Sequence, residues 1–179
     1  MSTDAQKRAL LTIARAAVAA AAGGEAAPRA AMDDAVPASG AFVTIKKRGE
    51  LRGCIGTLEC RRSLAEEIAR VAVSAAREDP RFPPVTEAEL PDLRVEISVL
   101  GPLERIDPAD AAAIEVGRHG LVVEQGRRRG LLLPQVAPEW GWDRPTFLAH
   151  ACRKAGLPPD AWRHGAAVYR FEADVFGDD

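Results

Sequence analysis

Residues 51–59 read Leu-Arg-Gly-Cys-Ile-Gly-Thr-Leu-Glu, and residues 51–58 of this stretch predict a short strand. The segment just before it, Ala41–Lys47, alternates β-branched and aromatic residues, which predicts a strand. Residues 48–50 read Arg-Gly-Glu and predict a hairpin turn between two strands. The sequence therefore predicts an antiparallel pair of strands over residues 41–58.

Helices and further strands surround this pair. Periodicity and capping signals predict helices over 5–22, 63–79, 108–113 and 143–154, a short helical stretch over 86–90, and strands over 93–100, 121–124, 130–133 and 166–176. This mixed order with at least two hairpins predicts an α+β fold with a largely antiparallel sheet flanked by helices. We expect a single domain over 1–179, in which 1–40 form an N-terminal helix and a wrapping connection.

Composition excludes several classes of protein. The 179 residues carry 24 basic and 26 acidic side chains, a net charge of -2 that does not favour a dedicated nucleic-acid binder. The three cysteines are sparse and odd in number, which indicates a reducing, cytoplasmic compartment. The longest nearly apolar run is short and rich in alanine, so we expect no membrane partner.

The quoted stretch aligns a cation, a thiol and a gap. Side chains two apart on a strand share a face, so we expect Arg52 and Cys54 to point the same way, with Gly56 leaving space beside them. A guanidinium favours the thiolate, which is the nucleophilic form of cysteine. Strand glycines such as Gly53 and Gly56 often mark the close approach of a ligand or a backbone. The alternative is structural: Cys54 as a small core residue and Arg52 paired with an acid.

Other polar residues are weaker candidates. Glu96 and Ser98 share one face of the predicted strand 93–100, where they line either a site or an ordinary polar face. Gln135 follows an apolar strand and is a candidate to hold a ligand or a backbone group. His119, at a strand entry, is a possible acid or base, although histidine there often just tolerates a turn.

The remaining cysteines and basic residues have simpler interpretations. Cys152 shares a helical stripe with apolar residues and is expected in the core, and Cys60 has no partner nearby in sequence. The spacing of cysteines and histidines does not fit a metal site, so we expect no metal and no cofactor. The run Arg127–Arg129 is expected at a solvated hairpin tip.

At this point the motifs resemble one family. The stretch 51–59 is similar to the hallmark of the AMMECR-type domain. Further matches to that family are Asp79-Pro80-Arg81-Phe82-Pro83-Pro84, Val95–Leu100, Gly120–Val123, Leu131–Ala137 and Cys152–Leu157. Together they cover nearly the full chain in the right order.

The resemblance implies a larger and a smaller subdomain with a cleft between them, near the Arg-Gly-Cys strand. Prokaryotic members are similar to protein A of the AmmeMemoRadiSam system, which implies Memo-like and radical SAM proteins as pathway partners. Carried over residue by residue, Arg52, Gly53, Cys54 and Gly56 match the hallmark. The later motif positions that match are Glu96, Ser98 and Gln135.

The resemblance favours a component of a pathway with Memo-like and radical SAM proteins whose biochemical activity it does not assign, with a cleft around Arg52 and Cys54, and three functions stay open. In the first, a cysteine-dependent enzyme, Cys54 is the nucleophile, Arg52 favours its thiolate and binds an anionic group, and Glu96 is the acid or base. In that enzyme Gly53, Gly56, Ser98 and Gln135 would contact a small-molecule ligand. In the second, the protein is a non-catalytic adaptor for the radical SAM partner. In the third, Lys46–Arg48 and the Arg127–Arg129 tip contact RNA, although nucleic acid is not the partner we expect.

Overall fold

The computed structural model describes residues 1–32 and 36–178. It divides into a larger unit, Met1–Gly101 with the C-terminal residues from Asp174, and a smaller unit, Pro102–Ala173. The predicted connection over 24–40 is partly packed, because Ala27, Met32 and Val36 lie against the core of the larger unit. Residues 33–35 of that connection lie outside the described residues.

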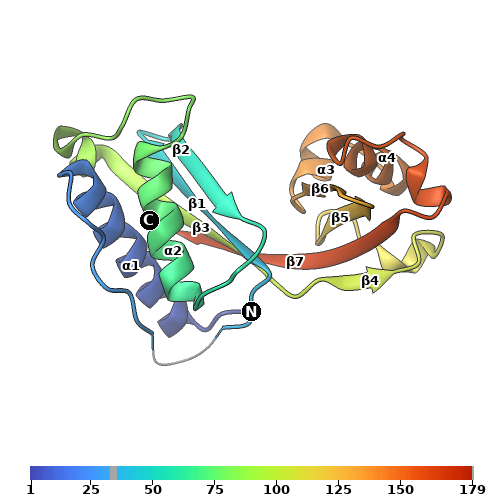
Figure 1. Ribbon diagram of the computed structural model, residues 1–179, viewed down its shortest axis with the longest axis horizontal. Coiled ribbons are helices and arrows are strands. Elements are labelled where there is room, and N and C mark those ends of the chain that lie inside the picture. The colour runs from blue at the N-terminus through green and yellow to red at the C-terminus, as the bar shows by residue number, and fades with distance from the viewer. Residues whose placement is uncertain (33–35, 179) are drawn as a thin grey trace. The chain divides into compact units, whose positions relative to one another are not determined.

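The larger unit packs two helices, side by side, against one face of an antiparallel sheet (Figure 1). Its elements are α1 (Asp4–Ala22), β1 (Gly40–Lys47), β2 (Glu50–Thr57), α2 (Leu64–Arg77), the 3-10 helix η1 (Glu87–Asp92) and β3 (Leu93–Leu100). The strand order is β2-β1-β3, and the end of β7 follows β3. Strand β2 is therefore an edge of this sheet.

Capping and apolar periodicity fix the two helices, and the sequence predicts both stripes and the capping box of α2. Capping boxes start both: Thr3 pairs with Gln6 at α1, and Ser63 pairs with Glu66 at α2. The buried faces of the helices and the odd-numbered residues of β1 and β3 form one core, in which Ile45 and other aliphatic side chains are fully enclosed. Each such side chain stabilises the fold by roughly 1.5–3 kcal/mol.

A β-bulge interrupts the pairing of β1 with β2. Ile45 pairs with Gly53 and Lys46 pairs with Leu51, so Arg52 has no partner residue on β1. An extra residue of this kind shifts the alternation of side chains along the bulged strand. The predicted hairpin is confirmed, and its turn residues Arg48 and Gly49 both have positive φ angles, of 51° and 86°.

The smaller unit has its own strands and its own core. Its elements are β4 (Glu104–Ile106), the 3-10 helix η2 (Ala111–Ala113), β5 (His119–Gln125), β6 (Arg128–Leu132), α3 (Val136–Trp140), α4 (Arg144–Lys154), the 3-10 helix η3 (Ala161–Arg163) and most of β7 (Ala167–Gly177). The pairs β4–β7, β7–β5 and β5–β6 are all antiparallel. Phe147, Leu148 and Cys152 of α4 are fully buried in this core.

The predicted α+β class with an antiparallel sheet and flanking helices is confirmed. The predicted helices at 86–90 and 108–113 are 3-10 helices, η1 and η2, and the short elements β4, α3 and η3 were not predicted. Within the described part of the chain, no helix is both long and apolar enough to cross a bilayer.

Two strand glycines let a helix backbone approach a sheet. A Cβ atom at Gly53 would lie 2.2 Å from the carbonyl oxygen of Ala75 in α2. A Cβ atom at Gly130 would lie 2.3 Å from the backbone nitrogen of Ala155, just after α4. No side chain larger than hydrogen fits at either contact unless the backbone moves. The glycine in the quoted motif is therefore explained by packing against α2.

We expect Gly53→Ala to destabilise the protein by roughly 1–3 kcal/mol, because β2 or α2 must shift to make room for the methyl group. Urea unfolding measures this change in free energy. Glu50→Ala, at the exposed end of the same strand, is the matched control and should stay within roughly 0.5 kcal/mol of the wild type. Equal stability of Gly53→Ala and the control would contradict the close contact.

Candidate functional site

The polar face of the larger unit's sheet, opposite α1 and α2, carries the thiol. Thr44 of β1 pairs with Cys54 of β2 on one side and with Glu96 of β3 on the other. Directly paired residues share a face, so these three side chains form one row across the sheet. A second row follows the same pairings and consists of Gly56, Phe42 and Ser98. We call the two rows, with Lys46, the thiol face.

Cys54 is half-buried and is held through both its side chain and its backbone. The hydroxyl of Thr44 donates a hydrogen bond to Cys54 Sγ at 3.2 Å. The backbone N–H of Cys54 donates to Asp79 Oδ2 at 2.9 Å, and its carbonyl accepts from Arg81 Nη2 at 3.4 Å. The segment after α2 thus satisfies both backbone groups that Cys54 presents at the edge of the sheet.

Asp79 is the centre of this arrangement. Its side chain is 2% exposed and accepts two hydrogen bonds from the guanidinium of Arg81, besides those from the backbone N–H groups of Cys54 and Arg81. The hydrogen bonds from Arg81 hold the pKa of Asp79 far below its usual range, although burial acts in the opposite direction. Asp79 is therefore an anion that fixes both the strand edge and Arg81.

Arg81 is a cation held at the backbone of Cys54. Its side chain is 54% exposed, so the guanidinium is accessible as well as held. The hydrogen bond to Asp79 raises the pKa of Arg81, and the charge of Cys54 adds a smaller effect in the same direction. The Arg81 guanidinium is thus fixed by Asp79 next to the backbone carbonyl of Cys54.

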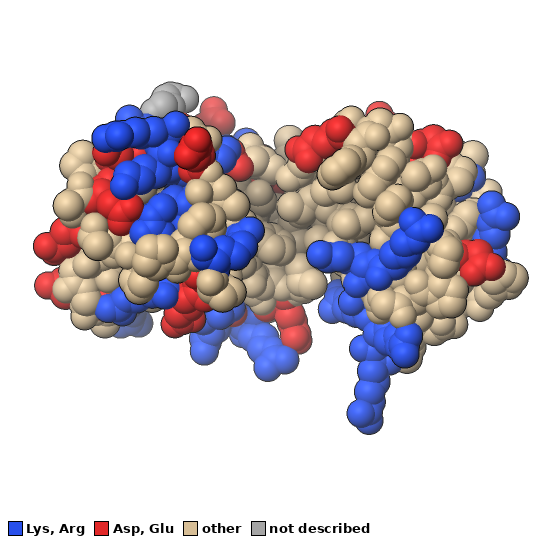
Figure 2. All heavy atoms as spheres, turned by 90° about the horizontal axis from the view of Figure 1, so that it is seen from above, with Lys and Arg blue, Asp and Glu red and all other residues tan. Residues whose placement is uncertain are grey.

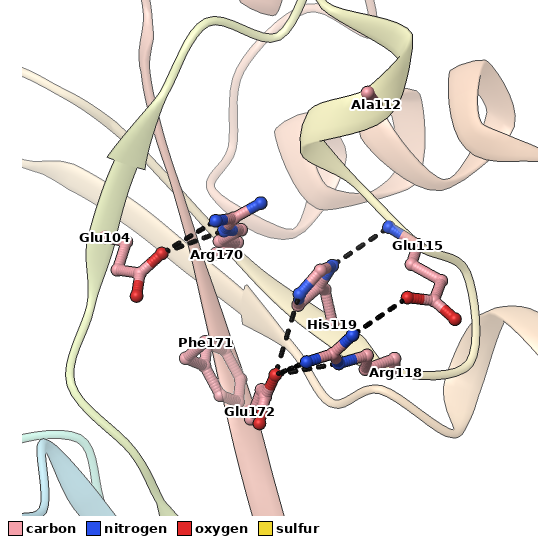
Figure 3. Close-up of a pocket in the computed structure, with 8 residues that line it drawn as sticks. All are labelled: Glu104, Ala112, Glu115, Arg118, His119, Arg170, Phe171 and Glu172. Atoms are coloured by element: carbon pink, nitrogen blue, oxygen red, sulfur yellow. Dashed lines mark hydrogen bonds and ion pairs between the residues drawn. The ribbon is translucent and has the colours of Figure 1, made fainter.

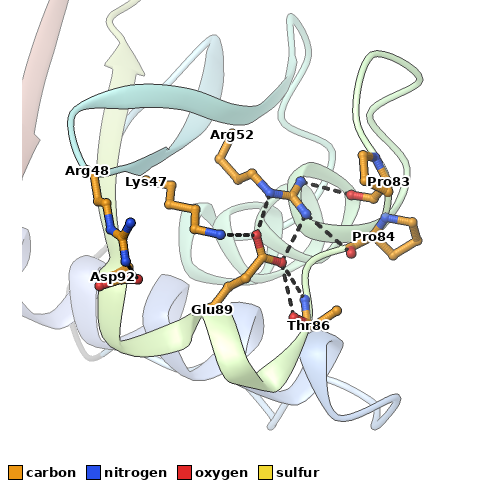
Figure 4. A network of polar contacts seen from close by, with 8 residues as sticks. All are labelled: Lys47, Arg48, Arg52, Pro83, Pro84, Thr86, Glu89 and Asp92. Carbon is orange, nitrogen blue, oxygen red and sulfur yellow. Dashed lines mark hydrogen bonds and ion pairs between the residues drawn. The ribbon is translucent and has the colours of Figure 1, made fainter.

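Arg52 does not share a face with Cys54, so that prediction is wrong. Arg52 sits at the bulge, and its guanidinium binds both carboxylate oxygens of Glu89, at 2.9 and 3.1 Å, on the side of the sheet that holds the helices (Figure 4). It also donates to the carbonyls of Pro83 and Pro84. Lys47, which lies on the core side, donates to Glu89 as well. The structural interpretation of Arg52, an arginine paired with an acid, is the one the geometry supports.

The other predicted site residues of the thiol face are only partly brought together. Glu96 is separated from Cys54 by Thr44, and its carboxylate forms an ion pair with Lys46 at 2.9 Å. Ser98 is 6% exposed, in the row next to Cys54. The expected gap at Gly56 is absent, because a Cβ atom there would lie 2.2 Å from the ring of Phe42, which fills the space.

Two predicted residues lie in the smaller unit. Gln135 is exposed and precedes α3, and its amide makes no hydrogen bond to any residue the structure describes. Gln135 therefore holds no backbone group in the described residues, and its contact with a ligand stays a prediction. His119 is 7% exposed, and its Nδ1 accepts a hydrogen bond from the backbone N–H of Glu115 at 2.9 Å.

The other two cysteines belong to the cores. Cys152 is fully buried, as predicted, and burial raises the pKa of its thiol. Cys60 is half-buried against the core of the larger unit, and burial raises its pKa too. All three thiols are free, and in residues 1–32 and 36–178 no three histidine, cysteine or acidic side chains converge as metal ligands do.

The sequence analysis missed three residues of this site: Thr44, Asp79 and Arg81. Asp79 and Arg81 stand in the quoted motif Asp-Pro-Arg-Phe-Pro-Pro, so the signal was present, but nothing in local spacing connects that motif to Cys54. Thr44 lies on the first predicted strand, on the face opposite that of Val43 and Ile45. Its contact with Cys54 depends on the register of the hairpin.

This fold and site define an α+β protein with a half-buried thiol on an antiparallel sheet. The chain belongs to the AMMECR1 family, whose model matches residues 11–176. This confirms the resemblance found in the sequence motifs.

Archaeal relatives of known sequence and structure share most of the chain. A protein of Methanothermobacter thermautotrophicus is 53% identical over 145 residues, which is 78% of this chain and 76% of that protein. One from Thermofilum pendens is 52% identical over 153 residues, 77% of this chain and 72% of that protein. The crystal structure of the uncharacterised protein PH0010 from Pyrococcus horikoshii matches with a TM-score of 0.80 and 42% identity, and covers 95% of this chain and 90% of that one.

We expect Arg52→Met to destabilise the protein by roughly 3 kcal/mol, because it leaves the mostly buried carboxylate of Glu89 with Lys47 as its remaining cation. The double variant Arg52→Met/Glu89→Met should recover much of the loss, since it removes both charges. Denaturant unfolding measures both changes.

Arg48→Met is the matched control, because the Arg48–Asp92 pair in Figure 4 has an arginine that is 76% exposed. Its loss should cost less than about 1 kcal/mol. A loss of the same size for Arg52→Met would mean that the Arg52–Glu89 pair contributes no more than an exposed pair.

The two held carboxylates also predict acid sensitivity. Hydrogen bonds from Arg52 lower the pKa of Glu89, and those from Arg81 lower the pKa of Asp79, in the folded state. Their stabilisation is fully present above the unfolded pKa values of about 4 and is lost as the pH falls below them. We expect the free energy of unfolding to fall steadily below about pH 4. In Asp79→Asn this fall should be shallower, and an unchanged slope would contradict the assignment.

Proposed function

We propose that the protein is a cysteine-dependent enzyme, in which the thiol of Cys54 acts on a small anionic substrate at the thiol face. The observation that carries the proposal is the hydrogen bond from Thr44 Oγ1 to Cys54 Sγ. A hydroxyl that donates to sulfur stabilises the thiolate over the thiol, and the thiolate is the nucleophile.

Arg81 takes the role that the sequence suggested for Arg52. Its guanidinium is fixed by Asp79 at the backbone of Cys54 and is more than half exposed, so it can meet an anionic group of the substrate beside the sulfur. Glu96 is the carboxylate in the row that contains Cys54 and Thr44. It acts as the acid or base on a substrate that lies across Thr44 between the two side chains. A cleft near β2, expected from the family resemblance, would hold the substrate.

We further propose that the enzyme works in a cytoplasmic pathway with Memo-like and radical SAM proteins. The partners rest on the family resemblance alone, and three free thiols fit a reducing compartment. Affinity capture of the tagged protein with each purified partner tests the pathway proposal. Cys54→Ser should leave this capture unchanged while it removes the thiol chemistry.

The hypothesis of an RNA-binding module receives less support. Lys46, Lys47 and Arg48 are each paired with a carboxylate, so they are not a free basic patch. On the face of the larger unit seen in Figure 2, basic and acidic side chains lie next to each other. Such an alternating surface gives little of the positive field that RNA binding needs.

Alkylation with two reagents of different charge tests the proposed function. Iodoacetate is an anion and iodoacetamide is neutral, and each forms a thioether with sulfur as iodide leaves. We expect Cys54 of the native protein to react, with a ratio of iodoacetate to iodoacetamide rates several-fold higher than in the denatured chain, because Arg81 attracts the anion. Mass spectrometry reads the reaction separately at Cys54, Cys60 and Cys152.

Two variants assign the effect to named residues. Arg81→Gln should return the ratio at Cys54 to that of the denatured chain, and Thr44→Val should slow both reagents by roughly fivefold, the equivalent of one net hydrogen bond of about 1 kcal/mol. Cys152 should be protected until the protein unfolds. An inert Cys54, or a ratio equal to that of the denatured chain, would overturn the proposal.

A further inference from the structure

A second polar site lies entirely within the smaller unit. It is a hollow of about 330 Å³ between β4, the segment that leads into β5, and β7 (Figure 3). The charged and polar side chains that line it are Glu104, Glu115, Arg118, His119, Arg170 and Glu172. None of these residues takes part in the thiol site proposed above.

His119 presents an unused donor to this hollow. Its side chain is 8% exposed, and its Nδ1 accepts the backbone N–H of Glu115 at 2.9 Å. A ring nitrogen that accepts a hydrogen bond carries no proton, so in the neutral ring the proton is on Nε2. The nearest carboxylate oxygen, Glu172 Oε1, is 3.9 Å from Nε2, too far for a hydrogen bond. The Nε2–H group therefore has no hydrogen-bond partner among the residues that the structure describes.

Two arginines flank this donor, and each is held by acids. Arg118 is bound by Glu172 and Glu115, and Arg170 is bound by Glu104 and by the carbonyl of Ala113. A guanidinium has five N–H groups, so each arginine keeps donors that these contacts do not use. Nε2–H of His119 and the spare N–H groups of the two arginines thus line the same hollow.

The same hollow also offers acceptors. The carboxylates of Glu104, Glu115 and Glu172 each accept hydrogen bonds from an arginine through one oxygen. Their second oxygens accept no hydrogen bond from the described part of the chain. The carboxylates of Glu104, Glu115 and Glu172 are 63%, 63% and 47% exposed. With the ring of His119 neutral, the lining carries three negative and two positive charges.

The ring of His119 is neutral at neutral pH. Burial lowers the pKa of His119, and the charges of Arg170 and Arg118 lower it further, more than Glu172 and Glu115 raise it. The carboxylates of Glu104 and Glu115 are more exposed than either arginine, so they lie at the rim of the hollow.

We propose that this hollow binds a small zwitterion of the α-amino acid type. The carboxylate of the ligand accepts from Nε2–H of His119 and from the spare N–H groups of Arg118 and Arg170. Its ammonium group donates to free oxygens of Glu172, Glu115 or Glu104. A simple anion would meet three carboxylates at the rim, and a simple cation would leave the Nε2–H of His119 without an acceptor from the ligand. A ligand of both signs satisfies both sets of groups.

NMR of the histidine ring nitrogens, in the intact protein, tests this site. The chain has three histidines, so the ¹⁵N signals of His119, His150 and His164 can be assigned by substitution. The probes are L-alanine, acetate, methylammonium and inorganic phosphate, each titrated alone at constant ionic strength. We expect L-alanine to shift the Nε2 signal of His119 with saturation, and to bind at least tenfold more tightly than the other three probes.

Two variants separate binding from folding. His119→Asn removes Nε2–H but can keep an acceptor for the backbone N–H of Glu115, and isothermal calorimetry should show at least a tenfold loss of alanine affinity. His164→Asn, at an exposed histidine outside the hollow, is the matched control and should bind as the wild type does. Glu104→Gln should weaken alanine binding and not acetate binding, so the proposal stays testable even if His119→Asn does not fold.

Three results would contradict the zwitterion site. Acetate or phosphate that binds as tightly as alanine would replace the zwitterion site with a simple anion site and overturn the proposal. The proposal also fails if no probe shifts His119, or if His119→Asn folds and binds alanine normally.

Discussion

The carboxylate of Asp79 is the contact on which the thiol site depends. A buried carboxylate is costly unless it is fully hydrogen-bonded, and this one accepts from the backbone of Cys54 and from the backbone and guanidinium of Arg81. One group therefore fixes an edge strand, the segment after α2 and a cation. The position of the sulfur follows from this arrangement and from the hydroxyl of Thr44 on the neighbouring strand.

Most of the larger elements could be predicted from local signals. Alternation predicted β1 and β3, and apolar stripes predicted α1 and α2, with a capping box at α2 alone, because these features act within a few residues. The elements β4 and α3 are only three and five residues long. A strand of three residues has fewer than two full alternations and a helix of five has fewer than two turns, so both carry little periodic signal. The bulge at Arg52 is a property of the pairing with β1, and no pattern in β2 alone announces it.

The same limit explains what was found and missed in the site. Cys54 shares a face with Gly56, and Glu96 shares one with Ser98, as predicted, because the alternation of each strand is regular at that point. Arg52 was misplaced because the bulge reverses its direction, and its true partner, Glu89, is 37 residues away in the sequence. Glycine in a strand was correctly taken as a sign of close approach, and the approaching groups in the structure are the backbone of α2 at Gly53 and the ring of Phe42 at Gly56.

The position of β2 at the edge of its sheet has a consequence for self-association. An edge strand with free N–H and carbonyl groups can pair with a strand of another molecule, and soluble proteins block such edges with charges or covering segments. Asp79 and Arg81 occupy the N–H and the carbonyl of Cys54 in the middle of this edge, and they place two charges there. The Asp79–Arg81 pair therefore also opposes edge-to-edge pairing of the sheets of two copies of the chain.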